Sequence, residues 1–310
     1  PRSEGGGVSV RAVDLFAGAG GFTTGASSAG VRVVYAANHW PFAVATHELN
    51  HPRTRHECQD LRQADWTSLP AYDLLLASPA CQGHSQASQP KRRAYHDAMR
   101  ATAWSVVDCA DVTNPRAFVV ENVPDFRRWR LYAEWRAALA KLGYAITELD
   151  VRASHHGVPQ RRDRFFVVGT RSGRAPYVHR SVAELAFGPC VEWSSGDWRP
   201  VTKASPNARA RIARAQANHG PRCLTQHVTG HPGVGLGEPI RTITTKDQWA
   251  VVDGDRYRPL TVRETARAMG FPDSYRFPVG AGRRDCVLAL GNAVPPPVAR
   301  DVVLATLEAA

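Results

Sequence analysis

The segment DLFAGAGGF, residues 14–22, decides the fold. It follows an apolar run at residues 8–16 that predicts a β-strand, and glycines occupy positions 18, 20 and 21. Glycine lets the backbone turn sharply and brings its N–H groups close to a ligand, because no Cβ is in the way. The pattern therefore predicts a nucleotide-type cradle after a strand. It lacks the GxGxxG spacing, and an ordinary tight turn is the alternative interpretation.

From this segment as far as residue 170, short apolar runs alternate with helical patterns. The helical patterns include one clear apolar stripe at residues 131–142. Alternation of this kind is typical of an α/β protein with a mostly parallel sheet and helices on both faces. Besides residues 8–16, the predicted strands are residues 31–37, 72–78, 117–121, 145–151 and 165–170.

The composition changes after Arg171, where Gly, Pro, Ser and Arg become dense and strands are short. Helical patterns return near Thr261, and residues 298–307 predict a closing helix that packs back onto the first part. We therefore expect residues 8–172 and 283–310 to form one large domain. Residues 173–282 should form a small, mostly irregular or β domain, and residues 1–7 a disordered end.

The charge of the chain favours a polyanionic partner. Its 310 residues include 39 basic and 28 acidic side chains, a formal charge of +11, and only four of the basic residues are lysine. Arginine suits phosphates and guanine edges, although a GC-rich genome also enriches arginine. Six widely spaced cysteines form no zinc motif and indicate a reduced, cytosolic protein. No apolar run approaches the roughly 20 residues of a membrane span.

Three further segments bring reactive groups to the ends of predicted strands. Cys81 lies in SPACQGHS, residues 78–85, and Glu121 lies in FVVENVP, residues 118–124. A thiol at a strand end, followed by arginines, can be held as a reactive thiolate, and a carboxylate beside it can act in acid–base chemistry. The segment VPQRRDR, residues 158–164, adds three arginines. Taken singly, these features also fit a buried cysteine and a solvated basic loop.

Taken in order, these segments resemble the DNA cytosine-C5 methyltransferase family over residues 12–300. The C-terminal landmarks of the resemblance are LTVRETARAMGFPD at 260–273 and GNAVP at 291–295. The resemblance implies an S-adenosylmethionine-dependent, Rossmann-like methyltransferase sheet in the large domain. It also implies that the small domain recognises the DNA target.

The resemblance further implies a catalytic set. The Cys81 thiolate would add to C6 of a cytosine, Glu121 would relieve ring charge at N3, and Arg164 would grip O2. Arg162 and Gln160 would support Arg164. Because C6 is stacked inside a duplex, the base would be flipped out, and residues 83–103 would fold over the DNA as a catalytic loop.

For the cofactor, S-adenosylmethionine, the resemblance implies that Phe16 packs on adenine and that Gly18 and Gly20 cradle the methionine part. Asp60 would accept from the adenine amino group, and no metal is implied. The remaining implied cofactor contacts are Gly21, His39, Trp40, Leu61, Pro79, Asn292 and Ala293. The chain departs from the family in two places: His39 or Asn38 stands where an acidic residue usually holds the ribose, and Ala80 replaces a proline before Cys81.

The implied partner is double-stranded DNA, with a separately acting restriction endonuclease as a further expectation. We expect a monomer without membrane attachment, in the cytoplasm of a bacterial or phage-infected cell. Two other functions fit the same resemblance: a tRNA cytosine methyltransferase, and a DNA-binding regulator with impaired catalysis. The implied DNA contacts are Gln82, Ser85, Arg93, Gln160, Arg209, Arg211, Gln226 and Thr244.

Overall fold

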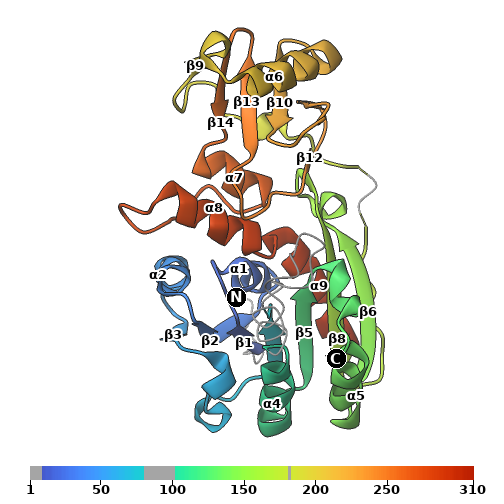
Figure 1. Ribbon diagram of the computed structural model, residues 1–310. Coiled ribbons are helices and arrows are strands. Elements are labelled where there is room, and N and C mark those ends of the chain that lie inside the picture. The colour runs from blue at the N-terminus through green and yellow to red at the C-terminus, as the bar shows by residue number, and fades with distance from the viewer. Residues whose placement is uncertain (1–8, 80–101, 181–182) are drawn as a thin grey trace, which may run out of the picture. The chain divides into compact units, whose positions relative to one another are not determined.

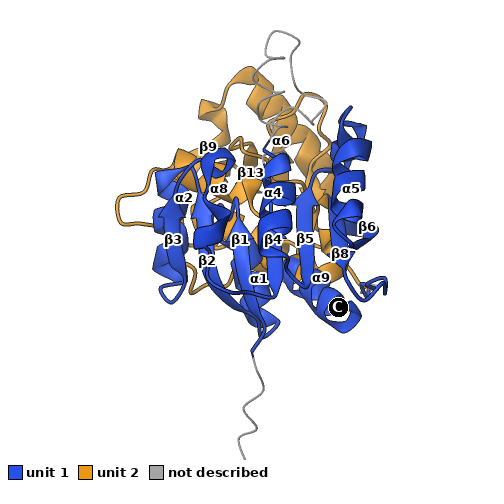
Figure 2. Ribbon diagram, turned by 90° about the horizontal axis from the view of Figure 1, so that it is seen from below, with its two compact units in different colours: residues 1–151, 164–179, 299–310 blue, residues 152–163, 180–298 orange. Residues whose placement is uncertain are grey.

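The computed structural model describes residues 9–79, 102–180 and 183–310. The expected disordered end and nearly all of the expected catalytic loop lie outside these residues. The chain divides into two compact units, which Figure 2 shows in different colours. Unit 1 comprises Pro1–Val151, Arg164–His179 and Ala299–Ala310, and unit 2 comprises Arg152–Asp163 and Arg180–Val298.

Unit 1 is built on a sheet whose described strands run in the order β3-β2-β1-β4-β5-β8-β6; Figure 2 labels all of them, and Figure 1 labels all but β4. The pairs from β3 to β5 are parallel, whereas β8 runs antiparallel to β5. The chain moves outward from β1 in one direction to β2 and β3 and in the other direction from β4 to β5, so the order reverses between β1 and β4. The strands are β1 (Arg11–Leu15), β2 (Arg32–Asn38), β3 (Arg55–Cys58), β4 (Leu74–Ala77), β5 (Ala117–Asn122), β6 (Ala145–Arg152) and β8 (Asp163–Thr170).

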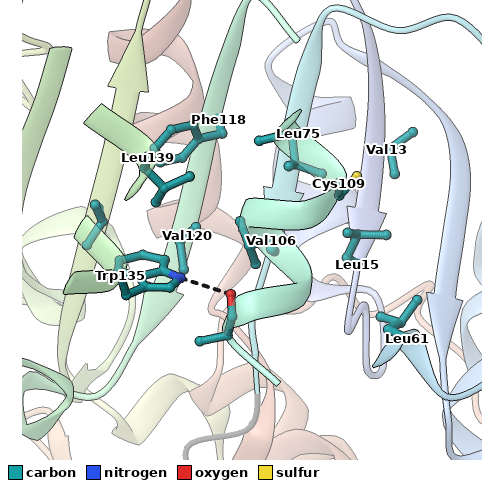
Figure 3. Close-up of a cluster of buried hydrophobic side chains, with 14 of the residues drawn as sticks. Val13, Leu15, Leu61, Leu75, Val106, Cys109, Phe118, Val120, Trp135 and Leu139 are labelled. Atoms are coloured by element: carbon teal, nitrogen blue, oxygen red, sulfur yellow. Dashed lines mark hydrogen bonds between the residues drawn. The ribbon is translucent and has the colours of Figure 1, made fainter. Parts of the chain in front are cut away.

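Helices cover both faces of this sheet. Side chains alternate between the faces along each strand, so Val13 and Leu15 of β1 join one core with Trp135 (Figure 3). The Trp135 indole N–H donates to the Ala103 carbonyl oxygen at 2.9 Å. On the opposite face, Asp14 accepts from the Thr23 hydroxyl. The helices of unit 1 are α1 (Gly21–Ser28), α2 (Pro41–Asn50), α4 (Trp104–Thr113), α5 (Tyr132–Lys141) and most of α9 (Pro296–Ala309).

Unit 2 has an antiparallel sheet with the strand order β11-β10-β13-β14-β9. Leu224 and Val251 lie on its buried face, which shares a core with Met269 and Leu290. The strands are β9 (Arg199–Pro200), β10 (Arg222–Gln226), β11 (Val234–Gly235), β13 (Trp249–Asp253) and β14 (Arg256–Pro259). A separate parallel pair joins β7 (Gln160–Arg161) to β12 (Ile240–Arg241), and the helices are α6 (Pro206–His219), α7 (Val262–Ala268) and α8 (Arg283–Asn292).

The predicted fold class is confirmed: a mostly parallel α/β sheet with helices on both faces, and a second part with a small antiparallel sheet. Strand β3 was not predicted. It pairs with β2 at the edge of the sheet, where its side chains are partly exposed. Its sequence, Arg-His-Glu-Cys, is therefore polar and lacks the apolar run of a buried strand. The predicted domain boundaries at 172/173 and 282/283 differ from the unit boundaries. They stay predictions, because compactness does not test which part binds DNA.

Candidate active site

The predicted reactive segments follow three neighbouring strands of unit 1. Phe16 comes directly after β1, Pro79 follows β4, and Glu121 and Asn122 end β5. Because β1, β4 and β5 are parallel, their carboxyl ends lie at the same edge of the sheet. This edge includes the point between β1 and β4 where the strand order reverses, which is where open α/β sheets bind ligands.

Glu121 and Arg164 form an ion pair at this edge. The Arg164 Nε lies 2.8 Å from Glu121 Oε1, and the two side chains are 12% and 8% exposed. The register brings them together: Glu121 pairs with Phe166, so Arg164 is its diagonal neighbour on the antiparallel strand β8. The structure thus places these two predicted residues in contact at the end of a buried strand, and their catalytic roles stay predictions.

Asn122 fixes the start of the segment that carries the predicted nucleophile. Its side-chain Nδ2 donates to the Pro79 carbonyl oxygen at 3.1 Å, and its Oδ1 accepts from the Val123 N–H at 2.9 Å. Pro79 is buried and lies two residues before Cys81. Cys81 itself lies outside the described residues, as do Ala80, Gln82, Ser85 and Arg93.

The glycine-rich turn after β1 has an uncommon backbone. Phe16 has a φ of 58°, Gly18 of 55° and Gly20 of 79°. A positive φ at a non-glycine residue costs about 1–3 kcal/mol and is often found at ligand sites. The Ser78 hydroxyl, at the carboxyl end of neighbouring β4, has no hydrogen-bond partner among the described residues. A left-handed turn beside an unsatisfied buried hydroxyl fits a small polar ligand at this edge.

The other predicted cofactor residues of unit 1 lie after β2 and β3. The Asn38 side chain accepts from the Trp40 N–H at 2.9 Å, and His39 is exposed. Asp60 accepts from the Arg62 side chain and N–H, and these hydrogen bonds lower its pKa to about 2. Leu61 is buried in the core of unit 1. In this structure the Asp60 carboxylate is therefore ionised at neutral pH and engaged by arginine.

Arg162 and Gln160 lie in the interior of unit 2, where their side chains bind backbone groups. Arg162 donates to the carbonyl oxygens of Ile243 and Gly291, both at 2.7 Å. Gln160 donates to the Ala268 carbonyl oxygen at 2.9 Å and accepts from the Ile243 N–H at 2.8 Å. These contacts hold the segments of unit 2 together. The catalytic role expected for Arg162 and the DNA contact expected for Gln160 stay predictions.

The remaining predicted residues are spread over unit 2. Asn292 is the exposed last residue of α8, and Ala293 after it is buried. Arg209 and Arg211 lie on α6. Gln226 ends β10, and the Thr244 hydroxyl accepts from the Lys246 N–H at 3.2 Å. Their roles toward cofactor or DNA stay predictions.

Sequence reasoning missed one buried polar group beside the turn: Asp14, Thr23, His47 and His56, which are linked by hydrogen bonds. The sequence feature that could have indicated this group is Asp14, an aspartate within a predicted buried strand. Among the residues that the structure describes, no group of three or more His, Cys, Asp or Glu side chains could hold a metal ion. Nor does that part of the chain contain a helix long and apolar enough to cross a membrane.

Comparison with known proteins gives a family match over nearly the whole chain. The model of the C-5 cytosine-specific DNA methylase family matches residues 10–185 and 198–307. The chain is 28% identical to the Type II methyltransferase M.NlaX of Neisseria lactamica, over 94% of each chain. It is 26% identical to the Type II methyltransferase M.HindV of Haemophilus influenzae, over 96% of this chain and 97% of that protein.

Solved structures with the same fold share less sequence. A DNMT2 mutant of Spodoptera frugiperda gives a TM-score of 0.71 at 16% identity, covering 96% of this chain and 100% of that chain. The methyltransferase EhMeth of Entamoeba histolytica also gives 0.71 at 16% identity, covering 97% and 99%. At this identity the likeness supports the fold alone.

Proposed function

We propose, because this chain belongs to the C-5 cytosine-specific DNA methylase family, that it transfers a methyl group to C5 of cytosine at a specific sequence in double-stranded DNA. The observation that carries the proposal is the Glu121–Arg164 pair at the carboxyl edge of the sheet. On the same edge, Asn122 holds the strand end from which the chain leads to Cys81. A nucleophile, a carboxyl group and a guanidinium would then act on one flipped-out base.

In the proposed reaction, the Cys81 thiolate adds to C6, and the π electrons of the C5–C6 double bond shift toward C5 and the N3 side of the ring. C5 thereby becomes nucleophilic and takes the methyl group. S-adenosylmethionine supplies that methyl group on a positively charged sulfonium. Loss of the proton from C5 then re-forms the double bond and expels the Cys81 thiolate, which leaves 5-methylcytosine and restores the enzyme.

Glu121, in its protonated form, would donate a hydrogen bond to N3 and so stabilise the negative charge that develops there as the thiolate adds. Arg164 holds one oxygen of that carboxyl group through its Nε, and its guanidinium would reach the neighbouring O2. Asn122 would act by position only, since its amide is bonded to the Pro79 carbonyl oxygen. These assignments give each polar group at the β5 end a separate task.

The glycine-rich turn would hold the methyl donor. Phe16 would pack on the adenine ring, and the backbone at Gly18 and Gly20 would accommodate the methionine part, because glycine has no Cβ and tolerates their left-handed conformation. Exposed His39 would stand beside the ribose in place of the usual acidic residue. The buried Ser78 hydroxyl, which has no hydrogen-bond partner among the described residues, supports the assignment.

DNA binding must offset the cost of unstacking the base, which is a few kcal/mol. Helix α6 would contribute to it, because Arg209 and Arg214 are exposed and no acidic residue lies between 206 and 219. Gln226, Thr244, Arg211 and Gln160 are the further candidates in unit 2. Most such contacts go to phosphates and position the enzyme without reading bases.

The test is methylation-aware sequencing of plasmid DNA from cells that express the chain. We expect 5-methylcytosine at one short recurring sequence, and none in cells that express Glu121→Gln at the same level. Unmodified DNA, together with labelled-methyl transfer to purified tRNA, would indicate a tRNA methyltransferase instead. Unmodified DNA and tRNA with intact DNA binding would indicate a regulator without catalysis.

A further inference from the structure

A chain of hydrogen bonds runs from the core of unit 1 to its surface beside the glycine-rich turn. The Thr23 hydroxyl donates to Asp14 Oδ2 at 2.7 Å and lies 3.0 Å from His47 Nε2. His47 Nδ1 lies 2.7 Å from His56 Nε2. Asp14, Thr23 and His47 are at most 1% exposed, whereas His56 on the edge strand β3 is half-buried. We call these four residues the histidine relay.

Three residues of the relay, Asp14, Thr23 and His47, lie next to the glycine-rich turn. Asp14 precedes Phe16 by two residues, and Thr23 lies in the first turn of α1, which begins directly after Gly20. A Cβ placed on Gly20 would lie 2.9 Å from the His47 ring, so that ring packs directly against the turn. The His47 ring and the first turn of α1 therefore support the backbone of the glycine-rich turn.

Two different placements of the hydrogen atoms satisfy every hydrogen bond of the relay. A hydroxyl has one hydrogen, and a neutral imidazole carries one on a single nitrogen. If Thr23 donates to an ionised Asp14, then His47 donates from Nε2, and His56 must donate from its Nε2. His56 also hydrogen-bonds the Thr54 backbone. Because Nε2 faces His47, the bond to Thr54 uses the Nδ1 hydrogen, and His56 carries a positive charge in this first arrangement.

In the second arrangement, every hydrogen bond is reversed. A protonated Asp14 donates to Thr23, Thr23 donates to His47 Nε2, and His47 donates from Nδ1 to a neutral His56. The two arrangements hold the same number of protons and differ by the transfer of one proton between Asp14 and His56. Each satisfies every contact in the relay, so neither leaves a buried polar group unpaired at His47.

We propose that His47 is a positioning residue for the glycine-rich turn, and that it acts through the histidine relay, which couples the turn to the protonation of His56. The inference rests on the proposed function only for the identity of the ligand held by the turn. Within the described residues, the titratable groups around the relay are His51, which follows α2 and acts on His47, and Glu48 of α2, which acts on His56. No cluster of ligating groups there could hold a metal ion.

Burial supports a neutral His47 and an exchangeable proton on Asp14. Desolvation lowers the pKa of His47 well below its usual 6.5. Desolvation also raises the pKa of Asp14 from 3.8 to about 7, against the opposing effect of its hydrogen bonds to Thr23. Near neutral pH, His47 therefore links Thr23 to His56 without becoming charged itself. Burial also lowers the pKa of His56 below its usual 6.5, so the arrangement with protonated Asp14 and neutral His56 is favoured at neutral pH and His56 takes up its proton at lower pH.

The test compares Thr23→Val, which cuts the relay, with Thr23→Ser, which keeps its hydroxyl. Thr46→Val is the matched control: Thr46 is also fully buried on α2, but its hydroxyl bonds only the Phe42 carbonyl oxygen among the described residues, at 2.7 Å. His56→Leu cuts the outer end at a half-buried position, so it tests the relay even if Thr23→Val folds poorly. Circular dichroism verifies the fold of each variant.

Two measurements use the chain without ligand. NMR of histidine rings should show that Thr23→Val lowers the titration midpoint of His56 by about half a pH unit, although Thr23 does not touch His56. The backbone amide resonances of Gly18 and Gly20 should shift in Thr23→Val and His56→Leu, and stay in place in Thr23→Ser and Thr46→Val. An unchanged His56 midpoint, or equal shifts in Thr46→Val, would overturn the proposal.

The third measurement is the affinity for S-adenosylmethionine by calorimetry. We expect Thr23→Val to weaken binding by about tenfold, the effect of one lost hydrogen bond, and Thr23→Ser to restore it to within about twofold. If Thr46→Val weakened S-adenosylmethionine binding equally, His47 and Thr23 would support the turn by packing alone, and the relay would have no role. Failure of the unaltered chain to bind would overturn the proposed cofactor, while the two ligand-free measurements would still decide whether the relay positions the turn.

Discussion

Two buried arginine–glutamate pairs, one in each unit, use the same chemistry for different ends. In unit 2, Arg258 and Glu264 are both fully buried and joined by two hydrogen bonds of 2.7 Å. Glu264 also accepts from the N–H groups of Thr261 and Glu192. In unit 1, Arg164 reaches Glu121 through its Nε, at the end of a strand, and both side chains keep some exposure.

The position of each pair and the other partners of its carboxylate distinguish a structural pair from a reactive one. The oxygens of Glu264 are engaged on all sides, and the same residue completes the capping box of α7, so this pair ties together segments of unit 2. Glu121 lies where parallel strands end and where ligands bind in such sheets. If Arg258–Glu264 is a locked pair and Glu121–Arg164 an edge pair, changes to the first should affect stability and changes to the second should affect activity.

Replacing Glu121 by Gln should separate activity from stability. We expect methyl transfer to fall by about 10²–10⁴-fold, because the group that relieves charge at N3 is lost. The shape of the side chain is kept, so the melting temperature should change by no more than about 2 °C. Initial rates with labelled S-adenosylmethionine and a thermal melt provide the two readouts. Unchanged rates would make the edge pair structural like its counterpart.

Replacing Glu264 by Ala should have the opposite signature. It leaves Arg258 as an unpaired buried charge, which costs about 3–5 kcal/mol of folding free energy. Urea unfolding followed by tryptophan fluorescence measures this loss. As a control, Arg258→Met combined with Glu264→Leu removes both charges and should recover most of the stability. A stable Glu264→Ala protein would show that the pair is not locked.

Acid should weaken unit 2 through the same residue. Burial acts to raise the pKa of Glu264, but hydrogen bonds from Arg258, Thr261 and Glu192 outweigh it, so the pKa lies below the usual 4.5. The stabilisation is therefore complete above pH 4.5 and is lost as the pH falls toward the folded pKa. Melting temperatures between pH 6 and 3 should fall less steeply for Glu264→Gln. Parallel curves for the two proteins would contradict this.

The smallest effect is expected on α6. Changing Arg209 and Arg211 to Ala should weaken DNA binding a few-fold and reduce the dependence of log affinity on log salt by about two, because two phosphate contacts are lost. Arg53→Ala, an exposed arginine of unit 1, is the control and should leave the slope unchanged. An unchanged slope in the double variant would remove α6 from the DNA surface.

Sequence reasoning found the parts of the fold and site that depend on local pattern. Buried strands such as β4 and β5 are continuous apolar runs, and Glu121 stands out as a carboxylate at the end of one. The edge strand β3 has no such run, and no local pattern shows that β8 is antiparallel to β5. That orientation is what brings Arg164 beside Glu121.

The contacts that sequence reasoning could not find are those between side chains distant in sequence. His47 and His56 meet because α2 packs beside β3, and Thr23 joins them from α1. Arg162 followed the predicted motif but lies inside unit 2, bonded to carbonyl oxygens. A motif identifies a residue type at a position, whereas its partners depend on packing that only the folded chain determines.

The most direct test of the central claim uses a DNA duplex with 5-fluorocytosine at the target base. Fluorine replaces the C5 hydrogen, so no proton can be removed from C5 after methyl transfer. The reaction should therefore stop with the enzyme covalently bound to the DNA. We expect a denaturation-resistant complex that forms only with S-adenosylmethionine, with mass spectrometry locating the link at Cys81. Tight binding of cofactor and DNA without any covalent complex would contradict the account.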